Sequence, residues 1–237
     1  MIIECRQLEK SYSQKKAVLD GLDLAVNEGE IFGLVGMNGS GKSTLIKAIL
    51  DLVSIDGGRI WIQGKTHREV MARKNIAYLP DRFSPPAHLR STDFIQYMLR
   101  LHGTRAGKPQ IEQVLQGLEL DPAILQETVN RLSKGMTQKI GLASCLLSGK
   151  SLLILDEPMS GLDPRARVLF KQRLAEYRQQ GKTVFFSSHM LADIEEMADS
   201  MAVLHQGRIR FNGSPVDFKQ QFGTENVEQA YMKCIEA

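Results

Sequence analysis

A glycine-rich segment near the start of the chain carries residue types that bind phosphate. Residues 36–44 read GMNGSGKST, which fits the spacing G-x-x-x-x-G-K-[ST]. Glycines let successive backbone N–H groups turn toward an anion, and a helix that begins here adds its positive dipole end. The apolar run 31–35 precedes the segment and a helical pattern follows it. The sequence therefore predicts a site for the phosphates of a nucleotide.

The residues of this segment have separate expected roles. Lys42 is placed to reach the β- and γ-phosphates, and Ser43 to ligate Mg²⁺. The alternative is a strand-to-helix turn that binds nothing, but a turn alone does not call for a lysine beside a hydroxyl. The other expected nucleotide contacts are Asn38, Gly39, Ser40, Gly41 and Thr44.

A second candidate site follows an apolar strand pattern at residues 151–155. Asp156 and Glu157 come directly after it, and ligand sites of open α/β sheets lie at the carboxyl ends of strands. We expect Asp156 to hold Mg²⁺, directly or through water, and Glu157 to accept a proton from the water that attacks the γ-phosphate. The alternative is a solvated Asp-Glu pair in a turn before a proline. The upstream phosphate segment favours the catalytic interpretation.

Three further motifs make the chain resemble the ABC ATPase family over nearly its whole length. Residues 132–138, LSKGMTQ, stand where the family has its signature motif; residues 160–163, SGLD, resemble its D-loop; and residues 187–189, SSH, resemble its switch-histidine motif. Tyr12 stands where the family has an aromatic residue that stacks on adenine. A lone histidine after a strand is more often structural, so His189 gains its meaning from the order and spacing of the whole set.

The resemblance implies a head-to-tail dimer that encloses two ATP molecules. Ser133 and the backbone of Gly135 would contact the γ-phosphate bound by the other subunit, and Asp163 would link the two sites. His189 would contact the γ-phosphate and distinguish ATP from ADP. The residues alone allow a second interpretation of Ser133, as a plain N-cap of the helical pattern that runs to Leu147.

Two positions depart from the family pattern. Asp81 stands where the family usually has a glutamine that touches Mg²⁺ and the attacking water. A carboxylate can ligate Mg²⁺ but cannot donate a hydrogen bond as an amide does, so we expect Mg²⁺ binding with altered hydrolysis or coupling. In the signature segment, Lys134 and Met136 replace a glycine and a glutamine, a variant that resembles ABC exporters whose ATPase is a separate polypeptide.

The pattern of apolar runs predicts an α/β fold. Strands are expected at 2–8, 18–26, 31–35, 59–62, 152–155, 183–186 and 201–205, and helices at 44–52 and 165–179. Between 85 and 147 only helical spacing recurs, which indicates an inserted helical segment. The resemblance implies one domain over 1–237: a P-loop NTPase (RecA-like) core at 1–84 and 149–237 with an antiparallel β subdomain, and an α-helical subdomain at 85–148.

Composition narrows the functional classes. With 43% hydrophobic and 24% charged residues, the 237-residue chain can form one sizeable core. A net charge of +3 does not argue for nucleic-acid binding, and three widely separated cysteines do not form a zinc or redox pair. No window approaches the ~18 apolar residues of a spanning helix, so a membrane role is expected to come through a partner.

The resemblance also implies that partner. An integral membrane permease would dock on the segment 82–101 and place the chain on the cytoplasmic face of the plasma membrane. Within this segment we expect Phe94, Met98 and Leu101 to face the chain's own core and Phe83 to meet the permease. A helical stripe at 227–235 is expected to pack on the core. Two alternatives stay open: a soluble ATPase that acts on nucleic acid or ribosomes, and a regulatory subunit with little turnover.

Overall fold

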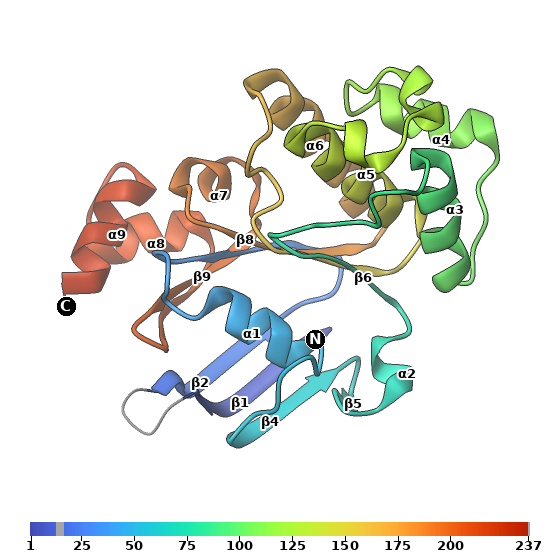
Figure 1. The fold of residues 1–237 in the computed structure, drawn as a ribbon. Helices are drawn as coiled ribbons and strands as arrows, with labels where there is room; N and C mark the ends of the chain where they lie inside the picture. The colour runs from blue at the N-terminus through green and yellow to red at the C-terminus, as the bar shows by residue number, and fades with distance from the viewer. Residues whose placement is uncertain (13–16, 237) are drawn as a thin grey trace.

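The computed structural model of the protein describes residues 1–12 and 17–236 and contains two sheets (Figure 1). The strands are β1 (Ile3–Ser11), β2 (Ala17–Val26), β3 (Ile31–Val35), β4 (Gly57–Ile62), β5 (Lys65–Thr66), β6 (Ile76–Leu79), β7 (Leu152–Leu155), β8 (Thr183–Ser188), β9 (Ser200–His205) and β10 (Arg208–Gly213). The helices are α1 (Lys42–Ile49), α2 (Val70–Arg73), α3 (Ser91–Leu101), α4 (Lys108–Gln116), α5 (Lys134–Leu147), α6 (Pro164–Gln179), α7 (Leu191–Met197), α8 (Pro215–Phe222) and α9 (Val227–Glu236), with short 3-10 turns η1 (Pro122–Gln126) and η2 (Val129–Arg131).

The central sheet is the layer that positions the predicted site. Its strand order is β10-β9-β3-β8-β7-β6, and β3 is parallel to both β8 and β9, as β7 is to β6 and β8. Strands β3, β7 and β8 are buried along their whole length, which explains their unbroken apolar runs. The carboxyl ends of β3, β7 and β8 therefore lie side by side at one edge, where the phosphate segment, Asp156 and His189 follow them.

Helices cover the two faces of this sheet differently. Helices α6, α7, α8 and α9 lie on one face, whereas α1 and the second sheet lie on the other (Figure 1). Alternate residues of β3 serve the two cores, since Ile31 and Val35 pack on the first side and Phe32 and Leu34 on the second. Phe32 stacks on Phe185 of β8, with ring centroids 5.5 Å apart.

The second sheet is the expected antiparallel β subdomain. Its order is β2-β1-β4-β5, and β1 pairs antiparallel with both β2 and β4. The α/β fold class with two sheets is thus confirmed. Three strands lie outside the predicted set: β5, β6 and β10.

Helices fill the predicted inserted segment. Phe94 on α3 is buried, and its ring meets Phe83 with centroids 5.6 Å apart, so Phe83 is half-buried in the core rather than free on the surface. Met98 packs on the same core, but Leu101 is 63% exposed. The expectation that Leu101 faces the core is therefore wrong, because α3 ends at this residue and turns it outward. The limits of the two subdomains stay a prediction.

The C-terminal helices close the far end of the central sheet. α8 begins with a capping box between Ser214 and Asp217. On α9 the predicted apolar stripe is buried, at Val227, Ala230, Tyr231 and Cys234. Among the residues that the structure describes, no helix is both long and apolar enough to cross a membrane.

Candidate nucleotide site

The phosphate segment forms the turn between β3 and α1 that its glycines predicted. Gly39 and Gly41 have φ angles of +82° and +112°, a region that favours glycine. A Cβ atom at Gly41 would lie 2.8 Å from the carbonyl oxygen of Val18, so this position also lacks room for a side chain. Lys42 Nζ donates to the carbonyl oxygen of Gly36 at 2.7 Å, and its side chain is only 6% exposed. The turn thus holds a buried ammonium group at the start of α1.

Asp156 and Glu157 follow β7 and meet the end of β8. Ser187 Oγ donates to Asp156 Oδ1 at 2.6 Å and accepts from the backbone N–H of Glu157 at 2.9 Å. Both Asp156 and Ser187 are buried. One serine hydroxyl therefore fixes both carboxylate residues, a role that the sequence did not assign to it, although residues 187–189 pointed to the segment.

Glu157 lies between Lys42 and His189. Its Oε1 is 3.3 Å from Lys42 Nζ, and its Oε2 is 2.8 Å from His189 Nδ1 and 3.3 Å from the backbone nitrogen of His189. Its φ of +50° is in the left-handed region, which costs a non-glycine residue about 1–2 kcal/mol and is often found where a side chain must be aimed. The structure thus brings together Glu157, His189 and Lys42, three of the four predicted catalytic residues, and the fourth, Asp81, lines a pocket together with Lys42 and Glu157.

The surroundings of Asp156 suit a divalent cation. Burial raises the pKa of Asp156 most strongly, hydrogen bonds from Ser187 and Ser43 lower it, and the negative charges of Asp81 and Glu157 raise it again. The predicted Mg²⁺ ligands Ser43, Asp156 and Asp81 are therefore close enough to influence one carboxylate, and all offer the oxygen donors that Mg²⁺ prefers. Mg²⁺ takes only one or two protein carboxylates beside substrate phosphates, and Asp156 and Asp81 would supply these. Among the described residues, no group of three or more His, Cys, Asp or Glu is placed to hold a metal ion.

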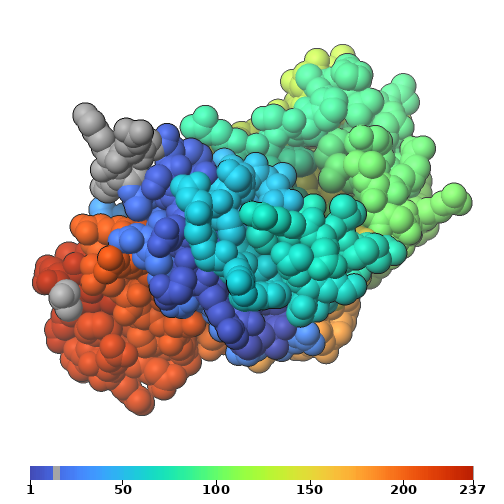
Figure 2. All heavy atoms as spheres, turned by 90° about the horizontal axis from the view of Figure 1, so that it is seen from below, coloured from blue at the N-terminus to red at the C-terminus, as the bar shows by residue number. Residues whose placement is uncertain are grey.

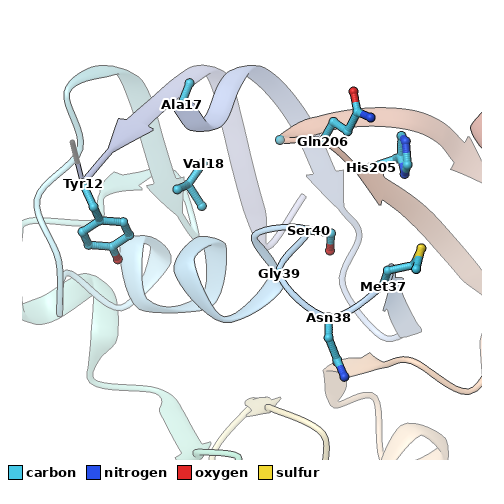
Figure 3. Close-up of a pocket in the computed structure, with 10 residues that line it drawn as sticks. Tyr12, Ala17, Val18, Met37, Asn38, Gly39, Ser40, His205 and Gln206 are labelled. Carbon is cyan, nitrogen blue, oxygen red and sulfur yellow. The ribbon is translucent and has the colours of Figure 1, made fainter. Parts of the chain in front are cut away.

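Two pockets that share lining residues open along the phosphate turn. One, of about 280 Å³, is lined by Lys42, Ser43, Thr44, Asp81 and Glu157 together with Tyr12. The other, of about 400 Å³, extends from Tyr12 past the turn, and Figure 3 shows Tyr12 at one end of it and His205 and Gln206 at the other. Both pockets are lined by Asn38 and Gly39, and the second by Ser40.

Some lining residues lie outside the predicted site. Val18 and Met37 line both pockets, and His205 and Gln206 form the turn between β9 and β10. Val18 comes close because a hydrogen bond from Asp20 N to the carbonyl oxygen of Gly207 joins β2 to this turn. Contacts between distant segments are not visible in a sequence pattern, apart from the Gln-Gly pair that marks the turn.

Ser133, Gly135 and Asp163 lie away from these pockets. Ser133 Oγ caps α5 by accepting from the backbone nitrogen of Met136 at 3.2 Å. Asp163 caps α6, where the N–H of Ala166 lowers the pKa of its carboxyl. A Cβ atom at Gly135 would lie 3.0 Å from the carbonyl oxygen of Gly161, so the start of α5 and the segment 160–163 approach each other closely. Within one chain these residues support structure: Ser133 is the N-cap of α5, and its contact with a nucleotide bound by another subunit stays a prediction.

Comparison with known proteins agrees with this geometry. A family profile described as ABC transporter matches residues 19–160, which is more than half of the chain. The chain belongs to the ABC transporter family. Among its relatives is the Nod factor export ATP-binding protein I of Rhizobium etli, 33% identical over 95% of this chain and 72% of that protein. Another is the daunorubicin resistance ATP-binding protein DrrA3 of Streptomyces coeruleorubidus, 33% identical over 93% and 70%.

An ABC transporter ATP-binding protein of Synechocystis is 34% identical over 90% of this chain, but the chain spans only 63% of its length. A solved ATP-binding subunit of an ABC transporter superposes with a TM-score of 0.91 and 29% identity, covering 99% of both chains. The P-loop NTPase fold and membership of the ABC transporter family are thereby confirmed.

Proposed function

We propose that this ABC family member hydrolyses ATP as the motor subunit of a membrane exporter. The observation that carries the proposal is the position of Glu157, whose carboxylate lies between Lys42 and His189 at the carboxyl ends of three parallel strands. This is where a carboxylate is needed to take a proton from water that attacks the terminal phosphate. Export is supported by the relatives named for Nod factor export and daunorubicin resistance.

ATP binding would rearrange the ion pair between Lys42 and Glu157. Lys42 now pairs with Glu157, and a terminal phosphate carries the larger charge for the same ammonium group. When Lys42 turns to the phosphate, Glu157 Oε1 is left free to accept the proton of the attacking water, while His189 still holds Oε2. Tyr12, which is 61% exposed, would stack on the adenine.

Bound Mg²⁺ would neutralise charge on the phosphates, and the residues placed to hold it are Ser43 and Asp156, with Asp81 beside them. Ser187 keeps the Asp156 carboxylate oriented through its 2.6 Å hydrogen bond.

A groove next to the site supports a membrane permease as partner. Its volume is about 670 Å³, and apolar side chains of Phe83, Val129 and Leu132 line it together with Arg82 and Lys134. The amide nitrogen of Gln138 is buried in its wall and makes no hydrogen bond among the described residues, so an incoming backbone carbonyl could satisfy it. Asp81 lines both this groove and the nucleotide pocket, which gives partner and nucleotide a shared residue. Docking there would hold the chain on the cytoplasmic face of the membrane.

The proposed dimer explains why the signature residues are not among those that line the pockets at the phosphate turn of their own chain. Ser133 caps α5, so its hydroxyl and the first N–H groups of the helix are presented together at one end. In a head-to-tail pair of identical subunits, this end would meet the γ-phosphate bound by the partner. Asp163 would lie at the same junction, next to Lys139 at 3.5 Å.

The test replaces Glu157 by glutamine, which keeps size and polarity but removes the charge. Hydrolysis should fall by about 10²–10⁴-fold, the range of general-base catalysis, while ATP binding remains. ATP with Mg²⁺ should then shift the variant from monomer to dimer in light scattering, and Ser133→Ala in the same chain should weaken that dimer. Glu228→Gln, an exposed change on α9, is the matched control. Full turnover by Glu157→Gln would reject Glu157 as the base.

The partner is tested separately, by purifying tagged Glu157→Gln protein from detergent-solubilised membranes with ATP and Mg²⁺. A stoichiometric polytopic membrane protein supports the exporter assignment. Ribosomal or DNA-bound proteins in its place would favour the soluble alternative.

A further inference from the structure

A second pocket lies on the antiparallel sheet, apart from the nucleotide site. Its volume is about 370 Å³, and Arg59, Trp61, Thr66, His67 and Arg68 line it. None of these residues lines either pocket at the phosphate turn. Figure 2 shows the face of the molecule on which the blue β1 and the cyan segments around β4, β5 and α2 come together. The proposed ATPase mechanism makes no use of this pocket.

The strand pattern turns positive charge outward here. In β4, Ile60 and Ile62 are buried, so Arg59 and Trp61 point to the opposite face. Arg59 is directly opposite Arg6 of β1 in the antiparallel register. Like charges at such opposed positions destabilise a sheet unless something of opposite charge lies between them.

A glycine bulge sits beside the pair of arginines. The register of β1 and β4 shifts between Arg6 and Glu9, where Gly58 has a φ of +82°. Bulges of this kind bend a strand and re-aim the side chain that follows. The residue that follows Gly58 is Arg59, at the rim of the pocket.

The acidic residues nearby do not neutralise the pocket. Glu4, which is opposite Trp61 in the strand register, pairs with Arg6 at 2.5 Å. Asp51 pairs with Arg73 at 3.2 Å and lies 3.9 Å from Nε2 of His67, so these two carboxylates pair with residues other than Arg59 and Arg68. Within the described part of the chain, Arg59 and Arg68 make no ion pair. Arg59 and Arg68 thus line one hollow, and no carboxylate is among its described lining residues. The Arg6 guanidinium carbon lies over the ring of the lining Trp61, 5.4 Å from its centroid.

We propose that this arginine pocket, lined by Arg59, Trp61 and Arg68, binds a phosphate group. Guanidinium groups match phosphate oxygens with paired, charge-assisted hydrogen bonds, and Thr66 adds a hydroxyl donor. Val70 and Met71 of the adjoining α2 are 76% and 54% exposed, and an indole with apolar neighbours and arginines is typical of a surface that meets lipid headgroups. The phosphate is therefore that of an anionic lipid, with free phosphate as the other source of the same chemistry.

Vesicle flotation tests whether the arginine pocket binds the phosphate of an anionic lipid. The wild-type protein, kept in saturating Mg-ADP so that its nucleotide site is filled, should float with phosphatidylglycerol vesicles and much less with phosphatidylcholine vesicles. Arg59→Gln/Arg68→Gln should lower the partition coefficient by about 30-fold, since each arginine near an anionic surface contributes about fivefold. Arg105→Gln/Arg210→Gln removes the same charge from exposed positions elsewhere and should change partition less than about threefold.

A thermal-shift assay with inorganic phosphate, also in saturating Mg-ADP, tests whether the arginine pocket binds free phosphate. Stabilisation of wild type that the double variant lacks, without vesicle binding, assigns the pocket to free phosphate. Equal behaviour of wild type and the double variant in both assays overturns the proposal. An ATP affinity equal to that of the wild type shows that the double variant is folded. If the double variant does not fold, the single variant Arg68→Gln replaces it in both assays. Failure of ATP hydrolysis in the wild-type chain would reject the proposed function and leave this result unaffected.

Discussion

Replacing Ser187 by alanine tests whether one hydroxyl organises the catalytic carboxylates. Ser187 is fully buried at the end of β8, and its Oγ makes two hydrogen bonds, to Asp156 Oδ1 at 2.6 Å and from Glu157 N at 2.9 Å. Alanine removes both bonds and almost no volume. Any effect therefore measures these bonds and not the packing of the core.

The expected loss of stability follows from the two partners. A hydrogen bond to a charged group contributes about 1.5–3 kcal/mol, and a buried N–H left without a partner costs about 1–3 kcal/mol. Because one small change can be relieved in part by relaxation, we expect a total of about 3 kcal/mol. For a domain of this size that lowers the melting temperature by about 6–12 °C.

The same substitution should change the dependence of activity on pH and on Mg²⁺. The Ser187 hydrogen bond lowers the pKa of Asp156, which burial raises above its ordinary value, so its loss raises that pKa further. Asp156 must be ionised to hold a cation, and the acid limb of the activity profile should move to higher pH. The pKa of Asp156 is higher in the folded protein than in the unfolded chain. Its contribution to stability is therefore fully present below the unfolded pKa and is lost as pH rises through the folded pKa. Ser187→Ala should extend this loss of stability to higher pH.

Urea unfolding and ATPase assays over a series of pH values and Mg²⁺ concentrations give both readouts. Ser144→Ala is the control, since Ser144 is equally buried but its Oγ donates only to the carbonyl oxygen of Ile140 within α5. That control should lose less than about 1.5 kcal/mol and leave the Mg²⁺ requirement unchanged. If Ser187→Ala matches it in stability, pH profile and Mg²⁺ requirement, the hydroxyl does not organise the site.

Three further changes test other parts of the structure. Gly58→Ala should lower the free energy of unfolding in urea by about 3 kcal/mol or more, because its Cβ would lie 2.3 Å from the carbonyl oxygen of Gln7. Gly64 has a similar φ but open space around it, so Gly64→Ala should lower that free energy by about 1 kcal/mol. Equal losses would contradict the steric argument. Burial lowers the pKa of His67, so wild-type stability should fall as pH drops from about 6.5 through the folded pKa, and His67→Gln, but not the exposed change His88→Gln, should reduce that slope. Asp81→Gln should raise the basal rate of ATP hydrolysis by about fivefold, because the amide can donate a hydrogen bond of about 1 kcal/mol to the attacking water. An unchanged rate together with an unchanged response to the partner would show that Asp81 does not limit hydrolysis.

The parts of the site that are continuous in sequence were predictable, because their chemistry depends on local conformation. The phosphate turn and the Asp156–Glu157 pair are of this kind. The meeting of Glu157 with Lys42 and His189 depends on the strand order β3-β8-β7, which brings together segments from distant parts of the chain. Periodicity does not encode that order, and only the family resemblance anticipated the result.

The missed strands have physical reasons of their own. β10 lies at one edge of the central sheet and places arginines between its apolar residues, so it lacks the unbroken apolar run of an interior strand. β6 lies at the other edge and is an apolar run of only four residues, a length at which periodicity does not distinguish a strand from a helical segment. β5 has two residues and depends on its pairing with β4. Leu101 fits the helical period of α3 but lies at its last turn, where the neighbours needed to bury it are absent. Edges and ends are where a local pattern carries least information about packing.

Asp81 is placed where a partner bound in the groove would influence hydrolysis at the nucleotide site. It follows β6 at the edge of the sheet, lines the nucleotide pocket and the partner groove together, and raises the pKa of Asp156 through its charge. A protein that fills the groove and draws Asp81 away would lower that pKa and favour the ionised form of Asp156, and it would also move one of the three predicted Mg²⁺ ligands. The carboxylate thus lets docking change the electrostatics of the site directly, where an amide would act through hydrogen bonding alone. On this account the departure from the family glutamine alters the means of coupling and leaves the site able to hydrolyse ATP.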